Sequence, residues 1–264
     1  MSTLRPDRTS MEGMIWNANH ILELALDPKK NGIRKDLFKN AIGISIMSTA
    51  EAGFIFSGNV GTGILLKKNA DGTWSPPCAM GLTGIGWGFI AGGQVKETIT
   101  FFFDDASLKS ALGDAGVRMA GQGALTLGNM GRNYDAGVGL SNKGFSGTFT
   151  TSFSSGAFGG LSVEGAAMAP RSGVNDTFYG TANTTPVSVV DGGVTFPADK
   201  PTLINEVYDK LKKLEEGATA TPTPDEAAKV ASMGASAQAA SDAVNKSSSD
   251  VVQVNAAEEA AKEG

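Results

Sequence analysis

Basic side chains crowd into the stretch from residue 29 to residue 39, and closely spaced ammonium and guanidinium groups bind anions. Asp36 is the only acid among them. Each basic residue near an anionic leaflet contributes roughly 1 kcal/mol of attraction, so the stretch predicts a membrane contact. The alternative is a solvated loop and short helix, because runs of charge usually face water. The basic residues are Lys29, Lys30, Arg34, Lys35 and Lys39.

An amphipathic helix is predicted just before this basic cluster. Apolar residues recur with the helical period over residues 11–26, and Ser10 is a candidate N-cap. Such a helix can lie at a bilayer interface, with Met14 and Ile15 inserted and Trp16 near the headgroups. The same apolar face can instead pack on a sheet of the domain. The pattern leaves both interpretations open.

The glycine-rich segment AGFIFSGNVGTG, residues 52–63, raises the question of a phosphate-binding loop. Nucleotide signatures place a helix N-terminus after the glycines, where aligned N–H groups hold the phosphate. Neither such signature occurs, and the glycines lead into further strand pattern. Glycines two residues apart, such as Gly61 and Gly63, instead predict a strip without side chains along one face of a sheet.

Other catalytic and metal chemistry finds little support. With one cysteine, Cys78, and one histidine, His20, the chain has no disulfide framework, Cys/His zinc site or Cys/His catalytic pair. Asp104 and Asp105 fit a helix cap better than a pair of catalytic acids. We therefore predict a protein that is not an enzyme and that uses neither a metal nor a cofactor. Additional candidate contacts for an anion are Lys67 and Lys68, which end a predicted strand.

The elements that position these residues define the fold class. Short apolar runs alternate as antiparallel strands do, most clearly over residues 145–153, and Asp71 before Gly72 marks a hairpin turn. Residues 85–103 suit one bent strand or two. The predicted class is α+β: a glycine-rich, mostly antiparallel β sheet, or a sandwich or barrel, with an N-terminal amphipathic helix and short flanking helices. The region of Pro186 and Pro197 is expected to be a loop.

The predicted organisation is an arm (residues 1–9), a domain (10–214) with its motif core at 40–182, and a tail (215–264). A docking helix capped by Thr202 ends the domain at 202–214. The tail holds nine acidic and three basic residues, lacks aromatic residues, and is predicted to be disordered or partly helical.

Charge and targeting signals bound the partners and the compartment. Residues 1–214 carry 19 basic and 18 acidic residues, so no broad basic field indicates nucleic acid. The first residues contain no apolar run typical of a signal peptide. We expect a cytoplasmic location with peripheral recruitment to membranes.

Several separated motifs together resemble the SYLF domain family, also called the Ysc-type actin-binding domain. The resemblance covers about residues 10–182. Its motifs occur in the family's order, which makes the likeness specific. They are KDLFKNAIGISI from residue 35, AGFIFSGNVGTGILL from 52, DGTWSPP from 71, GLTGIGWGF from 81, GRN at 131–133 and R-x-x-x-N-x-x-FYG from Arg171 to Gly180.

The resemblance implies a non-enzymatic module that binds phosphoinositides and membranes in endocytosis or membrane traffic. It also implies, as the alternative, a protein that binds or bundles actin filaments. A third hypothesis is a scaffold whose tail recruits partners. Arg132 and Arg171 lie inside family motifs and become candidate phosphate contacts. Glu51 and Asn59 depart from the family pattern, which has basic residues there.

Overall fold

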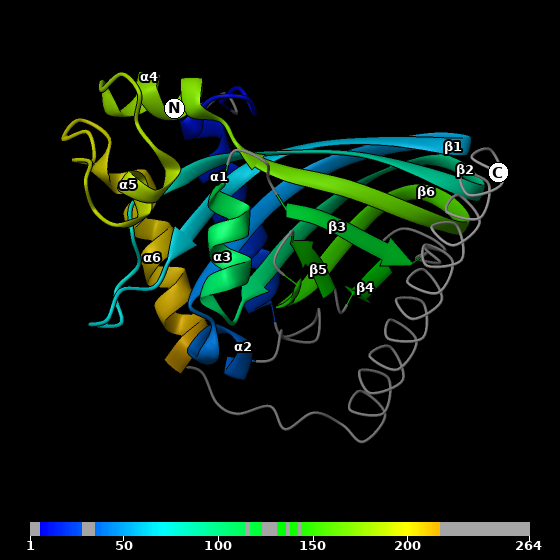
Figure 1. Cartoon of the computed structure of the whole chain (residues 1–264), viewed down its shortest axis with the longest axis horizontal. Coiled ribbons are helices and arrows are strands. Elements are labelled where there is room, and N and C mark those ends of the chain that lie inside the picture. The colour runs from blue at the N-terminus through cyan, green and yellow to red at the C-terminus, as the bar shows by residue number, and fades with distance from the viewer. Residues whose placement is uncertain are drawn as a thin grey trace, which may run out of the picture. The chain divides into compact units, whose positions relative to one another are not determined.

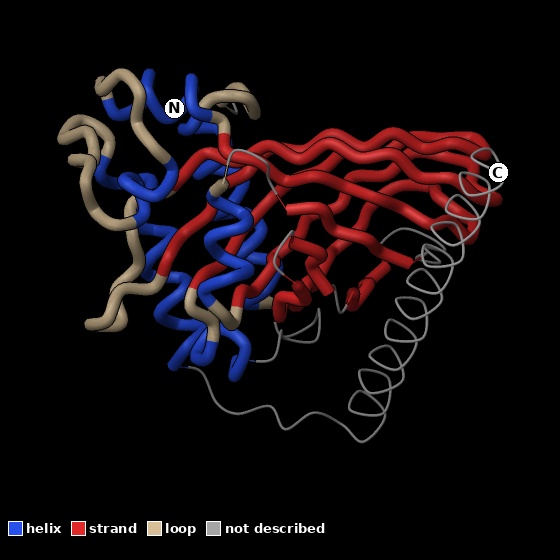
Figure 2. Tube along the Cα trace, viewed as in Figure 1, coloured by secondary structure: helices blue, strands red, loops and turns tan. Residues whose placement is uncertain are grey.

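Six antiparallel strands form one sheet, and the described helices gather at one end of its long strands (Figures 1 and 2). The computed structural model describes residues 6–27, 35–113, 117–122, 131–135, 138–141 and 144–216. Its helices are α1 (Met11–Leu26), α2 (Lys35–Asn40), α3 (Asp105–Leu112), α4 (Ser172–Tyr179), α5 (Pro186–Val190) and α6 (Pro201–Glu216). Its strands are β1 (Gly43–Lys67), β2 (Cys78–Phe102), β3 (Val117–Gln122), β4 (Gly131–Asp135), β5 (Val138–Ser141) and β6 (Gly144–Pro170).

The strand order is β1-β2-β6-β3-β5, with β4 paired to β6 beside this path. Every pairing is antiparallel, which confirms the predicted α+β class. The elements are longer than expected. Residues 145–153, where the predicted alternation is clearest, are only part of β6, and residues 85–102, predicted as one bent strand or two, lie in one strand, β2.

β1 doubles back on itself. Twenty-five extended residues would span about 80 Å, yet the Lys68 amide donates to the Ile42 carbonyl over 2.8 Å and so joins the two ends of the strand. The bend coincides with a register shift, because Phe54 lies opposite Ala91 whereas Phe56 lies opposite Trp87. The two parts of β1 on either side of this bend are called its limbs below.

The glycines of β1 allow its limbs to approach each other. A Cβ atom added to Gly63 would lie 2.1 Å from the Ile46 carbonyl oxygen and 2.7 Å from the Met47 Cα. At Gly61 it would lie 2.4 Å from the Thr49 hydroxyl oxygen. No side chain fits at such distances, so these glycines serve the close approach of two strand segments, as predicted, and not the binding of a phosphate.

The limbs of β1 present two different faces. Even-numbered residues, such as Ile44, Ile46 and Ile64, pack in one core cluster with apolar residues of α1 and α6. We call this the outer face. Odd-numbered residues, such as Met47 and Leu65, belong to a second cluster with residues of α3 and α5, and we call theirs the inner face. At the helical end of the sheet, both faces are therefore buried in apolar side chains.

Capping residues in the sequence predict where the helices begin, with two exceptions. The Ser10 side chain accepts from the Gly13 amide and Asp104 caps α3 through the Ser107 amide, both as predicted. The expected Thr202 cap is wrong, because α6 begins one residue earlier, at Pro201, where proline suits the first turn. The region expected to be a loop near residue 186 instead contains α5, capped by Thr185.

Polar contacts fix α1 against α6 and against Lys200, the residue before α6. Lys200 donates to Glu12 over 2.5 Å, and Lys210 donates to Glu23 over 2.7 Å. Burial opposes the charged form of Glu12, yet the hydrogen bond and charge of Lys200 hold the pKa of this carboxyl below its usual value. The ends of the domain are thus tied together on the outer face of the sheet.

Candidate functional site

The most distinctive family-like motif, residues 171–180, joins the sheet to α4. The fully buried Asn175 accepts a hydrogen bond from the Ala79 amide over 2.8 Å, and the Tyr179 hydroxyl donates to the Pro77 carbonyl over 2.7 Å. Gly180 ends the helix with a φ of 66°, which favours glycine. The motif therefore performs a structural task.

Two of the predicted anion contacts, Lys67 and Arg171, are engaged within the protein. Lys67 donates to Asp191 over 2.6 Å, and the Arg171 guanidinium donates to the Thr9 carbonyl over 2.7 Å. Both groups link segments far apart in sequence, so their charge serves the fold. Arg132 lies in β4 opposite Phe153, and its side chain lies outside the described part of the chain.

Lys68 has the most partners of the predicted anion contacts. Its ammonium lies 3.0 Å from a Glu215 carboxylate oxygen and 5.4 Å from the centroid of the Trp74 ring. It also donates to the carbonyls of Phe38 and Lys39, at the C-terminal end of α2. Cations stabilise helix C-termini in this way. Lys68 thus holds α2 by hydrogen bonds and α6 by an ion pair, beside the hairpin turn.

The basic cluster of residues 29–39 is only partly described. Lys39 is exposed at the end of α2 and makes no ion pair with any residue that the structure describes. The backbone of Lys35 begins α2. Lys29, Lys30 and Arg34 lie outside the described residues. Lys39 is therefore the member of the cluster whose exposed side chain the structure describes, and the anion site itself stays a prediction.

The predicted insertion of α1 into lipid needs correction at two residues. Met14 and Ile15 are fully buried in the core cluster that α1 shares with β1 and α6. Their apolar surface is already removed from water by the sheet, which was the alternative interpretation, so neither side chain can reach a bilayer in this fold. Trp16 is half-buried, and its ring stacks against His20 with 6.1 Å between centroids.

A group of apolar side chains that sequence reasoning missed is exposed near the bend of β1. The exposed fractions are 75% for Phe54, 69% for Phe56, 63% for Val60 and 78% for Ile85. We call these four residues the distal face. In the sequence, Phe54 and Phe56 look like ordinary strand residues, although the absence of charged residues from 52 to 66 is a usable signal.

Near the bend of β1, the inner face of the sheet carries polar side chains. Glu51 is only 2% exposed, and one of its carboxylate oxygens lies 2.7 Å from the Lys96 ammonium and accepts from the Gln94 amide over 2.9 Å. Ser57 and Asn59 are also buried there. Glu51 and Asn59, which depart from the family pattern, therefore point inward and change no surface charge.

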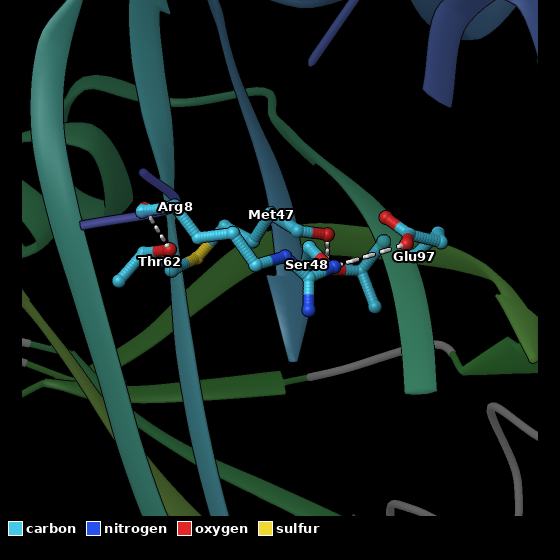
Figure 3. A network of polar contacts seen from close by, with 6 residues as sticks. Arg8, Met47, Ser48, Thr62 and Glu97 are labelled. Atoms are coloured by element: carbon cyan, nitrogen blue, oxygen red, sulfur yellow. Dashed lines mark hydrogen bonds and ion pairs between the residues drawn. The ribbon is translucent and has the colours of Figure 1, made fainter. Parts of the chain in front are cut away.

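The N-terminal arm crosses the outer face between its covered and uncovered parts. Figure 3 shows Arg8 reaching toward Ser48 and Glu97. The guanidinium donates to the Ser48 hydroxyl over 2.6 Å and lies 3.8 Å from the Glu97 carboxylate. The Thr62 hydroxyl donates to the Arg8 carbonyl over 2.8 Å, which ties the arm to the second limb of β1.

Groups suited to catalysis or metal binding do not gather in the described part of the chain. Burial raises the pKa of the Cys78 thiol to about 12, so this cysteine stays protonated and unreactive. No group of three or more His, Cys, Asp or Glu side chains in the described ranges could hold a metal ion. No helix of the described residues has the length and apolarity to cross a bilayer.

A helix-braced antiparallel sheet with an uncovered apolar face is typical of a domain that binds a partner. The family model Ysc84, described as "Las17-binding protein actin regulator", matches residues 83–214, from β2 to α6. The chain belongs to this family, which confirms the resemblance found in the sequence. The family is of an actin-regulator type, and its description is not that of an enzyme.

Curated relatives resemble the chain over part of their length. An SH3 domain-containing protein of Schizosaccharomyces pombe is 29% identical over 222 residues, which are 82% of this chain and 51% of that protein. Protein YSC84 of Saccharomyces cerevisiae is 33% identical over 61% of this chain and 34% of its own length. SH3 domain-containing YSC84-like protein 1 of Bos taurus is 31% identical over 67% and 50%. The chain thus spans about half or less of the relatives it matches.

Proposed function

We propose that the chain is a non-enzymatic adaptor that binds phosphoinositide-containing membranes and acts in endocytosis or membrane traffic. The observation that carries the membrane part is the exposed side chain of Lys39, which makes no ion pair with the described residues and ends a cluster of five basic residues. Lys67, Lys68 and Arg171 have partners within the protein, so residues 29–39 are the best candidates for anionic headgroups. The proposed location is cytoplasmic, with recruitment to the membrane surface.

Reversing the charge of this cluster is expected to weaken binding to anionic vesicles at least tenfold. The reason is that each basic residue contributes roughly 1 kcal/mol of attraction near an anionic leaflet. The measurement is cosedimentation with phosphatidylcholine vesicles that contain a phosphoinositide, at low and moderate salt. The variant carries glutamate in place of Lys29, Lys30, Arg34, Lys35 and Lys39.

The matched control reverses Lys109 and Lys213, two exposed lysines on α3 and α6. This control should bind vesicles nearly as the parent protein does. Equal binding by the cluster variant, the control and the parent would remove residues 29–39 from the proposed site.

A second candidate function, binding or bundling of actin filaments, is favoured by the family description of an actin regulator. We expect the chain to sediment with filaments at high speed. A single site cannot crosslink filaments, so bundling at low speed requires a second site or self-association. A chain that stays in the supernatant at saturating filament concentration would exclude this function for residues 1–264.

A further inference from the structure

The distal face brings exposed apolar side chains of two strands onto one face of the sheet. Ile85 lies opposite Gly58 in the pairing of β1 with β2. Residues opposite each other share a face of the sheet, and diagonal neighbours are within reach of large side chains. Ile85, Phe56 and Val60 therefore share this face, and the position of Gly58 between them stays open, because a Cβ added there would have no atom within 4 Å. Phe54 continues the surface beyond the register shift.

Near the bend of β1, apolar side chains are exposed on the outer face of the sheet and polar side chains are buried on its inner face. Near the helices the outer face is covered, but beyond the contacts of Arg8 with Ser48 and Thr62 its large apolar side chains are exposed. On the inner face, the charged and polar side chains of Glu51 and Asn59 are buried. Water favours the opposite arrangement. Apolar groups outside and polar groups inside suit a surrounding medium of low polarity.

Charge is missing from both strands around this surface. Residues 52–66 of β1 and residues 78–95 of β2 contain no Asp, Glu, Lys, Arg or His. Just outside these stretches, Glu51 and Lys96 pair with each other on the inner face, and Glu97 lies beside Arg8. On the neighbouring strand β6, Glu164 lies opposite Gly86. A protein partner in water is usually met by a polar rim around an apolar centre, whereas hydrocarbon disfavours any charge.

We infer that the distal face inserts its side chains among the acyl chains of a lipid bilayer. The inference rests on the proposed membrane function and adds to it a contact that needs no anionic headgroup. Only the side chains enter the acyl region, because interfacial segments reach about 5–10 Å into the headgroup and acyl boundary. The backbone then stays at a depth where water and headgroups satisfy its polar groups.

A fluorescent label on the distal face tests the insertion directly. Phe56→Cys in the full chain is labelled with an environment-sensitive dye, and Val187→Cys on α5 is the control because Val187 is 48% exposed. Cys78 is buried and should not react. The labelled proteins are mixed with phosphatidylcholine vesicles, with or without phosphatidylserine, that carry a quencher on the acyl chains. We expect quenching and a blue shift at position 56 and neither at position 187.

Serine substitutions give an independent measurement. Phe54→Ser combined with Phe56→Ser should weaken vesicle binding about tenfold or more at moderate salt, where attraction between charges is screened. Val187→Ser should bind as the parent protein does. Because the replaced side chains are exposed, the thermal transition of each variant should match that of the parent, which separates loss of binding from loss of folding.

The outcomes distinguish this inference from the proposed function. Sedimentation with vesicles but no quenching at position 56 overturns the insertion and leaves headgroup binding in place. If the label at position 56 is quenched and charge reversal of residues 29–39 leaves vesicle binding unchanged, the insertion is supported and the basic cluster is excluded from the membrane site. A blue shift without vesicles that grows with protein concentration overturns the lipid assignment, because a second copy then covers the distal face.

Discussion

Replacing Gly63 with alanine is expected to lower the free energy of unfolding by about 3 kcal/mol or more. The new methyl carbon would lie 2.1 Å from the Ile46 carbonyl oxygen and 2.7 Å from the Met47 Cα, and these backbone atoms cannot move without separating the limbs of β1. Urea unfolding followed by circular dichroism measures the effect.

Gly58 provides the matched control for this substitution. It lies in the same strand, yet an added Cβ there would have no atom within 4 Å. Gly58→Ala should therefore change the free energy of unfolding by no more than about 0.5 kcal/mol. Equal unfolding midpoints for the two alanine variants would contradict the close approach of the limbs.

The second large effect is expected at the buried ion pair of the inner face. Lys96→Met would remove the ammonium 2.7 Å from the Glu51 carboxylate and leave a buried negative charge. Breaking one partner of a buried pair costs about 3–5 kcal/mol. The measurement is the free energy of unfolding at neutral pH, where the Glu51 side chain of the unfolded chain is ionised and solvated.

Two further variants make this result specific. Lys109→Met removes an exposed lysine of α3 and should change the free energy of unfolding by less than about 1 kcal/mol. Glu51→Gln added to Lys96→Met should recover most of the lost stability, because the buried charge is then gone. Similar losses for Lys96→Met and Lys109→Met would show that the pair is not buried in solution.

The sequence predicts best what depends on neighbouring residues. The period of residues 11–26, the Ser10 cap and the Asp104 cap are local signals, and the structure confirms them. The length and bend of β1 are not local. Its glycines look like breaks between short strands, whereas their role depends on residues near the other end of the same strand, such as Ile46 beside Gly63.

The same distinction explains the candidate site. The charges of Lys67 and Lys68 are visible in the sequence. Their partners Asp191 and Glu215 come from the C-terminal third of the chain, so the sequence does not show that these lysines form ion pairs. The amphipathic pattern of α1 shows an apolar face without showing what covers it. In the distal face, alternation identifies the outward side chains of the strand, but only the tertiary structure shows where the cover of helices ends.

The contacts between α1 and α6 have a consequence for synthesis. A growing chain emerges from the ribosome with its N-terminus first, so the apolar face of α1 is exposed long before α6 exists. Lys200 and Lys210 must follow α1 out of the ribosome before they can pair with Glu12 and Glu23. Until then α1 presents an amphipathic surface to chaperones or lipid. The domain is thus completed only after α6 has been synthesised, when its last described helix covers its first.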